Sequence, residues 1–112
     1  MPRTATRTGS AGTDPQLAKL ARKAGEAAQL LKLLANEKRL LILCRLAMDG
    51  EVTVNDLAAG VGLSQSALSQ HLAKLRDDKL VATRRDGQSV HYRIANADAA
   101  RLLATLRDIY CA

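Results

Sequence analysis

The chain has 112 residues, enough for one domain with a core but few enough that dimerisation would add to its stability. Only two aromatic residues, Tyr92 and Tyr110, are present, so the core must come from Leu, Ala, Val and Ile, which favours helices over a β-sandwich. The net charge of +6 suits a polyanionic partner, a balance also found in ribosomal and membrane-surface proteins, and no apolar run approaches the roughly 18 residues of a membrane helix.

Residues 1–13 carry two arginines and no apolar core segment, so they are not a secretory signal. Their Gly, Ser and Ala content predicts a flexible N-terminal arm rather than an amphipathic transit peptide. With two cysteines and no export signal, we expect a cytoplasmic protein whose thiols are reduced.

Residues 14–112 are expected to form one domain. Asp14 and Pro15 supply an N-cap and a first helical residue. The helix that follows has a long apolar seam, at Leu17, Leu20, Ala24, Leu31 and Leu34. Such a seam is either a core face or, because it exceeds what one small domain needs, a dimerisation face.

Asn36 is expected to cap a second helix over 37–48. Leu40, Leu41, Ile42, Leu43, Leu46 and Ala47 make this helix apolar nearly all round. Such a helix belongs in the interior.

Asp49-Gly50 ends that helix, and Glu51-Val52 predicts a short strand beside a later hairpin. Thr53 then caps a short helix with Val54, Leu57, Ala58 and Val61 turned inward. The turn Gly60 to Leu63 leads to a further N-cap at Ser64. Two capped amphipathic helices around one short turn predict a helix-turn-helix.

The helix over 64–77 is the predicted recognition helix. One face is apolar, at Ala67, Leu68, Leu72 and Leu75. The other carries short or amide side chains that can hydrogen-bond base edges: Gln65, Ser66, Ser69, Gln70 and His71. At about 1.5 Å per residue it is about 20 Å long and fits a B-DNA major groove.

A basic hairpin follows, with strands over 80–85 and 88–94 joined at Asp86-Gly87. Half of the net positive charge falls on residues 64–93. A last helix is expected to start at Asn96 or Asp98 and to pack through Leu102, Leu103, Leu106, Ile109 and Tyr110 on the first helix of the same or another subunit.

These segments together resemble the ArsR/SmtB family of winged helix-turn-helix repressors. The matching stretches are Leu34 to Leu40, Leu57-Ala58, Leu63 to Leu75 and His91-Tyr92-Arg93. The resemblance covers about residues 15–112. It implies a mainly α fold with a small β-hairpin, and a homodimer built from the first and last helices. It also implies binding to an imperfect palindromic operator on double-stranded DNA, which the dimer leaves when an inducer is sensed.

The resemblance also implies possible metal sites, and each needs particular ligand residues. The thiolate metal site of the third helix needs Cys-Val-Cys, where this chain has Thr53-Val54-Asn55. The zinc site of the last helix needs histidines, and none follows His91. We therefore expect no metal and no cofactor.

Cys44 and Cys111 remain, in the second and the last helix. Their arrangement resembles the dithiol branch of the family, the sulfide- or persulfide-responsive repressors of the BigR and SqrR type. That resemblance implies a redox switch in which the two cysteines are joined by a disulfide or by extra sulfur atoms. From spacing alone, the favoured interpretation is that Cys44 is a small buried hydrophobe and Cys111 an idle thiol near the chain end.

The resemblance assigns DNA contacts to the recognition helix and the hairpin. The expected base readers are Gln65, Ser66, Ser69, Gln70 and His71, with Gln70 the preferred adenine reader and His71 alternatively a packing or phosphate residue. Expected phosphate contacts are Lys74, Arg84, Arg85 and Arg93, with Gln88 at the wing tip by the minor groove.

Three alternatives stay open beside the redox-switched repressor. The first is a repressor without a thiol switch, constitutive or responding to another ligand. The second is a thiol oxidoreductase, which the lack of a Cys-x-x-Cys motif disfavours, so we expect no enzyme. The third is a winged helix that binds RNA or a protein partner, which is consistent with the charge alone.

Overall fold

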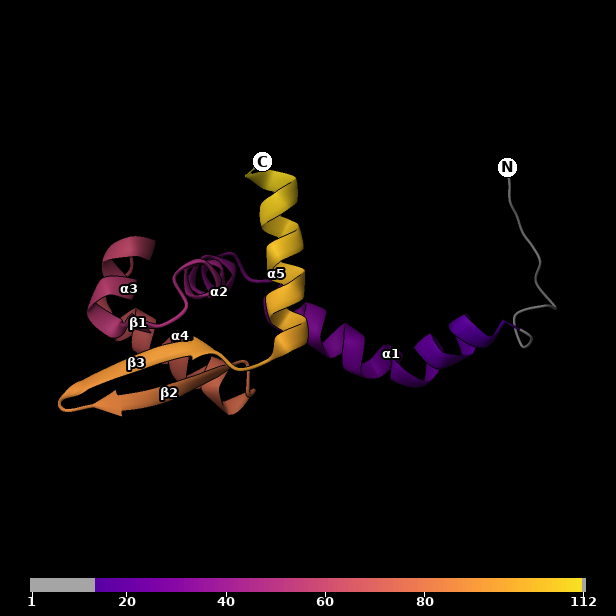
Figure 1. The fold of residues 1–112 in the computed structure, drawn as a ribbon, viewed down its shortest axis with the longest axis horizontal. Helices are drawn as coiled ribbons and strands as arrows, with labels where there is room; N and C mark the ends of the chain where they lie inside the picture. Colours follow the sequence, from indigo (N-terminus) through magenta and orange to yellow (C-terminus); the bar gives the residue numbers. More distant parts are fainter. Residues whose placement is uncertain (1–13, 112) are drawn as a thin grey trace. The chain divides into compact units, whose positions relative to one another are not determined.

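The computed structural model describes residues 14–111, so the predicted flexible arm over 1–13 lies outside the described residues (Figure 1). The chain divides into two compact units, residues 1–34 and residues 35–112. None of the helices in the described part of the chain is long and apolar enough to cross a membrane.

The described part of the first unit is the helix α1, Pro15–Leu34. It begins as predicted, because the Asp14 carboxylate accepts hydrogen bonds from the backbone N–H groups of Gln16 at 2.9 Å and Leu17 at 3.2 Å. Pro15 at the first helical position has no N–H that would need a partner. The predicted seam therefore runs along one continuous 20-residue helix.

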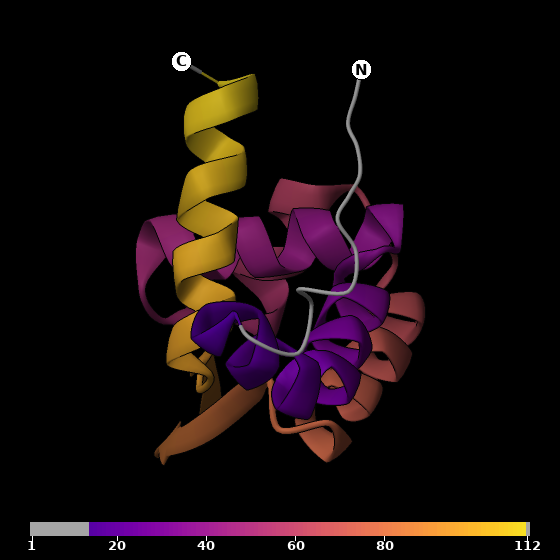
Figure 2. The same cartoon turned by 90° about the vertical axis from the view of Figure 1, so that its right-hand side faces the viewer.

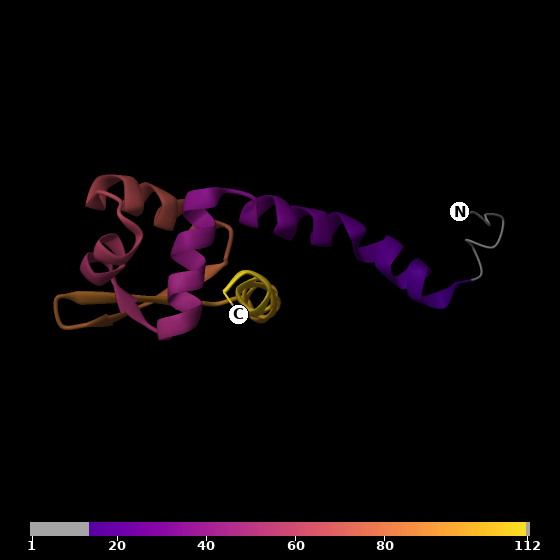
Figure 3. The same ribbon diagram turned by 90° about the horizontal axis from the view of Figure 1, so that it is seen from above.

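The second unit contains four helices and a small antiparallel sheet. Its elements are α2 (Glu37–Asp49), β1 (Val52–Thr53), α3 (Val54–Val61), α4 (Gln65–Asp77), β2 (Val81–Asp86), β3 (Ser89–Ile94) and α5 (Ala97–Tyr110). The strand order is β1-β3-β2. This is the predicted winged helix-turn-helix arrangement. In Figures 1 and 3, α3, α4 and the hairpin lie at one end of this unit and α5 lies at the other.

Branched aliphatic side chains form the core of this unit. Nine large side chains are at most 1% exposed: Ile42, Leu43, Leu46, Leu57, Leu68, Leu72, Leu75, Leu80 and Leu103. They come from all four helices and from the start of the hairpin. The core therefore holds α4 against α3 and β2 through one face only.

The expectation that α2 is buried all round is wrong. Ile42, Leu43 and Leu46 are buried, but Leu41 and Met48 are 46% and 59% exposed. A 13-residue helix packed against neighbours on one side leaves its other side uncovered within the chain. Apolar composition identified the helix but not which of its faces is covered.

The bounds of the strands and the residues of the hairpin turn also differ from the prediction. The strands run to Asp86 and resume at Ser89, so the connecting residues are Gly87 and Gln88 rather than Asp86 and Gly87. Gly87 has φ +63°, which suits the first central residue of a type II′ turn. The short strand is Val52–Thr53, one residue later than predicted, and Val52 pairs with Tyr92 of β3.

Candidate nucleic-acid interface and thiol pair

Two side-chain caps and one glycine fix the geometry of the helix-turn-helix. The Thr53 hydroxyl accepts from the N–H of Asp56 at 3.3 Å, and the Ser64 hydroxyl accepts from the N–H of Ala67 at 3.1 Å. Between the two helices, Gly62 has φ +70° and its N–H donates to the carbonyl of Ala58 at 3.0 Å. The start of α4 is therefore set by local hydrogen bonds.

The polar face of α4 points away from the core. Leu68, Leu72 and Leu75 anchor the opposite face and are buried. Of the predicted readers, His71 is half-buried, and the exposed ones are Gln65, Ser66, Ser69 and Gln70. A rigid helix therefore presents a row of uncharged hydrogen-bonding groups, as major-groove reading requires.

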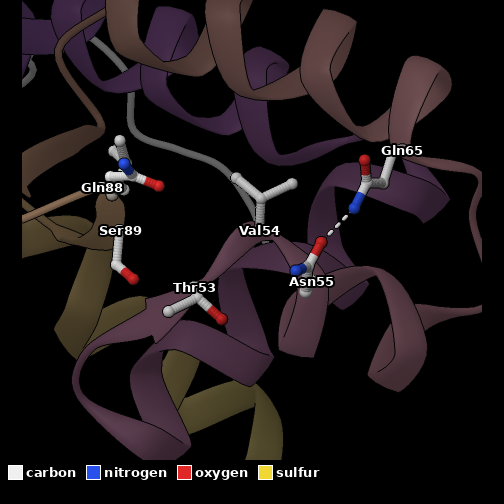
Figure 4. Close-up of a pocket in the computed structure, with 7 residues that line it drawn as sticks. Thr53, Val54, Asn55, Gln65, Gln88 and Ser89 are labelled. Carbon is white, nitrogen blue, oxygen red and sulfur yellow. Dashed lines mark hydrogen bonds between the residues drawn. The ribbon is translucent and has the colours of Figure 1, made fainter.

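One of these side chains has a partner that was not predicted. The Gln65 amide donates to the Asn55 side-chain oxygen of α3 (Figure 4). Both residues line a cleft of about 310 Å³, shared with Gln88 and Ser89 of the hairpin. The start of α4 and the wing thus face a common cleft. No local sequence signal pointed to Asn55, because its partner Gln65 lies ten residues further along the chain.

The hairpin carries the predicted cationic residues, with one of them already paired. Arg85, Gln88 and Arg93 are exposed. The Arg84 guanidinium donates to both carboxylate oxygens of Glu51, with the shortest contact at 2.8 Å. This hydrogen bonding lowers the pKa of Glu51 below its usual 4.5 and raises the pKa of Arg84. Arg84 therefore ties the wing to the residue before β1.

Lys74, the remaining predicted phosphate contact, lies near the C-terminal end of α4. Its ammonium group forms an ion pair with Asp78 at 3.2 Å. Exposed ion pairs of this kind contribute at most about 1 kcal/mol, so a phosphate can compete for the lysine.

α5 packs against α2 (Figure 2), Cys44 lies within α2, and Cys111 directly follows the last residue of α5. Cys44 is half-buried on α2, Cys111 is exposed at the C-terminal end of α5, and both are free thiols. Burial raises the pKa of Cys44 above its ordinary 9.0, the charge of Cys111 raises it further, and the charge of Arg107 lowers it. The Cys44 thiol is therefore within electrostatic reach of Cys111.

No group of three or more His, Cys, Asp or Glu side chains within residues 14–111 is arranged to hold a metal ion. At the third-helix position considered from the sequence, Thr53 is a helix cap and Asn55 is hydrogen-bonded to Gln65. These two side chains already have structural roles there.

Comparison with known proteins gives a consistent result. Residues 36–83 match the family described as bacterial regulatory protein, arsR family. The HTH-type transcriptional regulator YgaV of Escherichia coli is 44% identical and aligns with 86% of this chain and 97% of its own. The biofilm growth-associated repressor of Agrobacterium fabrum is 44% identical, with 81% and 77% of the two chains aligned.

Solved structures agree with these relatives. The transcriptional repressor BigR from Xylella fastidiosa superposes with a TM-score of 0.78 at 39% identity, covering 85% of this chain and 96% of that one. Reduced HlyU from Vibrio cholerae superposes with a TM-score of 0.78 at 42% identity, covering 84% and 98%. The winged fold and the order of its elements are thus shared with known regulators.

Proposed function

The chain belongs to the arsR family of bacterial regulatory proteins, which bind DNA and typically dimerise, and we propose that it is a repressor switched by Cys44 and Cys111. In the reduced state the dimer binds its operator. Oxidation of the two thiols, or their bridging by sulfane sulfur, lowers that affinity.

Operator binding in this proposal uses the α3–α4 pair and the wing of each subunit. Two copies of α4 enter successive major grooves about 34 Å apart, so the operator is an imperfect palindrome. The base readers are Gln65, Ser66, Ser69, Gln70 and His71. The phosphate contacts are Lys74, Arg84, Arg85 and Arg93, with Gln88 by the minor groove. The exposed amide and hydroxyl face of α4 supports this assignment.

Dimerisation in this proposal uses α1 and α5 of each subunit. The outward side of α5 carries Leu102, Ile109 and Tyr110, all exposed within the chain. α1 carries Leu17, Leu20 and Leu31, also exposed. Large aliphatic and aromatic side chains at these positions would be covered in a symmetric dimer.

The switch begins with the exposed thiol. The Cys111 thiolate attacks the outer sulfur of an organic persulfide, RS–SH; the S–S bond of the donor breaks, RS⁻ leaves and Cys111 becomes Cys–S–SH. The Cys44 thiolate then attacks Sγ of Cys111, a disulfide forms and HS⁻ leaves. The two thiols lose two electrons, the sulfane sulfur gains them as sulfide, and the two thiol protons end on RSH and H₂S.

A longer bridge follows the same chemistry. If both cysteines have become persulfides, one attacks the other, a trisulfide bridge forms and H₂S leaves. Either bridge joins α2 to α5. Because a disulfide holds its Cα atoms about 4.4–6.8 Å apart, bridging fixes α5 against the core and changes the spacing of the two reading heads in the dimer. A coupling of about 1–3 kcal/mol changes operator affinity by about 5- to 150-fold.

The observation that carries the switch is the packing of α5 on α2, which brings together a helix that contains the half-buried Cys44 and a helix that ends at the exposed Cys111. An accessible first thiol beside a shielded second one suits sequential attack. The similarity to BigR and to a HlyU described as reduced is consistent with a thiol-dependent regulator.

Mass spectrometry combined with gel shifts tests this proposal. Treatment of the reduced protein with glutathione persulfide should give a Cys44–Cys111 bridge and a loss of operator binding. Cys44→Ser and Cys111→Ser should each keep operator binding after the same treatment. If the bridge forms and binding is unchanged, or if no bridge forms, the repressor has no thiol switch and its inducer is another ligand.

A further inference from the structure

The junction of α2, α5 and the end of β3 contains an open groove of about 430 Å³. Its lining is mostly apolar and includes Leu46, Ile94 and Ala104, and two arginines, Arg93 and Arg107, line it as well. The volume lies within the range of about 300–1,000 Å³ that is usual for small-molecule sites.

The groove shares its helix faces with the two thiols. On α5, Ala100, Ala104, Arg107 and Cys111 follow one another at spacings of four, three and four residues, which is one helix face. On α2, Cys44 lies three residues before the lining residue Ala47. The groove and the thiol pair are therefore adjacent parts of one α2–α5 junction.

The charge of the groove suits an anion. Within residues 14–111, neither Arg93 nor Arg107 forms an ion pair. The carboxylate that lines the groove belongs to Glu51, which pairs with Arg84 at 2.8 Å and is also within electrostatic reach of Arg93. The lining therefore keeps an excess of positive charge beside apolar residues, which is complementary to a carboxylate on a small organic body.

We propose that this groove binds a carboxylate-bearing organic persulfide through Arg107 and Arg93, and so presents its outer sulfur to Cys111. The proposal rests on the proposed function and names the donor that the switch uses. Arg107 precedes Cys111 by about one helical turn, or about 5.4 Å along the axis. A carboxylate held by Arg107 thus keeps the rest of the donor beside the thiol, in the position for the sulfur transfer described above.

Binding without chemistry provides the first test. Cys44→Ser/Cys111→Ser protein cannot accept sulfur, and S-methylglutathione is a dicarboxylate that cannot donate it. Titration followed by NMR should give saturable shifts in α2 and α5, weakened about tenfold by Arg107→Gln, since a charged hydrogen bond contributes more than about 1.4 kcal/mol. Arg101→Gln is the matched control, because Arg101 is 84% exposed on α5 and pairs with Asp98.

Saturable shifts that Arg107→Gln leaves unchanged, or no shifts at all, overturn the groove as a donor site. Shifts confined to dimer-forming residues of α1 and α5 would also overturn it, because the groove would then be filled by a second copy of the chain. None of these outcomes depends on the thiols, so they leave the proposed switch standing.

Bridging rates provide the second test, with glutathione persulfide and inorganic tetrasulfide as the two donors. Arg107→Gln should slow bridging by glutathione persulfide about tenfold more than bridging by tetrasulfide, which has no carboxylate. Arg107 also lowers the pKa of Cys44, but this effect is the same for both donors and cancels in the ratio of the two bridging rates. Equal slowing overturns donor docking, whereas no bridging by either donor in the unsubstituted protein overturns the switch itself.

Discussion

The α3–α4–wing end and the α2–α5 end of the second unit use the same core for different purposes. At the first end, buried leucines hold a helix whose amide and hydroxyl side chains are exposed. At the second end, the Cys44 side chain is half-buried, and this burial raises the pKa of its thiol. Recognition therefore depends on a rigid support, and the proposed sensing depends on groups whose surroundings can be changed by one covalent bond.

The largest expected effect comes from loosening the support of α4. Leu72 is 1% exposed, so Leu72→Ala should lower the free energy of unfolding by about 2–5 kcal/mol, because it leaves a cavity under the reading helix. Urea denaturation measures this loss. Arg76→Ala, at an exposed position of the same helix, should stay within about 0.5 kcal/mol. A similar loss for both variants would contradict the one-sided anchoring of α4.

A change on the outer face of α4 should leave stability alone and alter recognition. Gln70→Ala should weaken operator binding by about 1–3 kcal/mol, because a carboxamide that both donates and accepts discriminates one base from another. Its affinity for random duplex should stay the same. Fluorescence anisotropy on both DNAs gives the comparison, and unchanged discrimination would remove Gln70 from the reading set.

The reading end was predictable from the sequence in more detail than the thiol end. Caps at Thr53 and Ser64 act over three residues, so local sequence determines where α3 and α4 begin. The contact of Gln65 with Asn55 spans ten residues and that of Arg84 with Glu51 spans 33, so neither had a local signal. Both contacts arise only when separate elements pack.

The thiol end depended more on family resemblance. Sequence spacing identified Cys44 and Cys111 but left their proximity open, because α2 and α5 are separated by the whole reading head. The exposure of Leu41 and Met48 was missed for a related reason: apolar periodicity does not reveal which faces other elements cover. Arg107 was not singled out, since an arginine near the end of a helix is usually only a solvated residue.

Thiol reactivity sharpens the contrast between an exposed and a shielded group. Iodoacetamide should alkylate Cys111 faster than Cys44 at neutral pH, because Cys111 is exposed and Cys44 is half-buried. The alkylation rate of Cys44 should keep rising above pH 9.0, because burial holds the pKa of its thiol above that ordinary value. Peptide mass spectrometry over a pH series follows both sites. Faster modification of Cys44 than of Cys111 would reverse the order of attack in the proposed switch.

The smallest effect concerns the ion pair that ties the wing to β1. Hydrogen bonding by Arg84 lowers the pKa of Glu51, so the pair contributes stability that is present above pH 4.5 and is lost as the pH falls through the lower folded-state pKa. Glu51→Gln should flatten this part of the stability curve below pH 4.5. Thermal melts between pH 3 and pH 6 measure it, and identical curves would mean that the pair does not stabilise the wing.

The central claim is that Cys44 and Cys111 control the affinity with which α4 and the wing bind DNA. The most direct test measures operator affinity by fluorescence anisotropy in three states of one preparation. The protein is first reduced, then bridged with glutathione persulfide, and then reduced again with dithiothreitol. The account predicts that affinity falls about 5- to 150-fold on bridging and returns on reduction. Equal affinity in all three states, with the bridge verified by mass spectrometry, would contradict it.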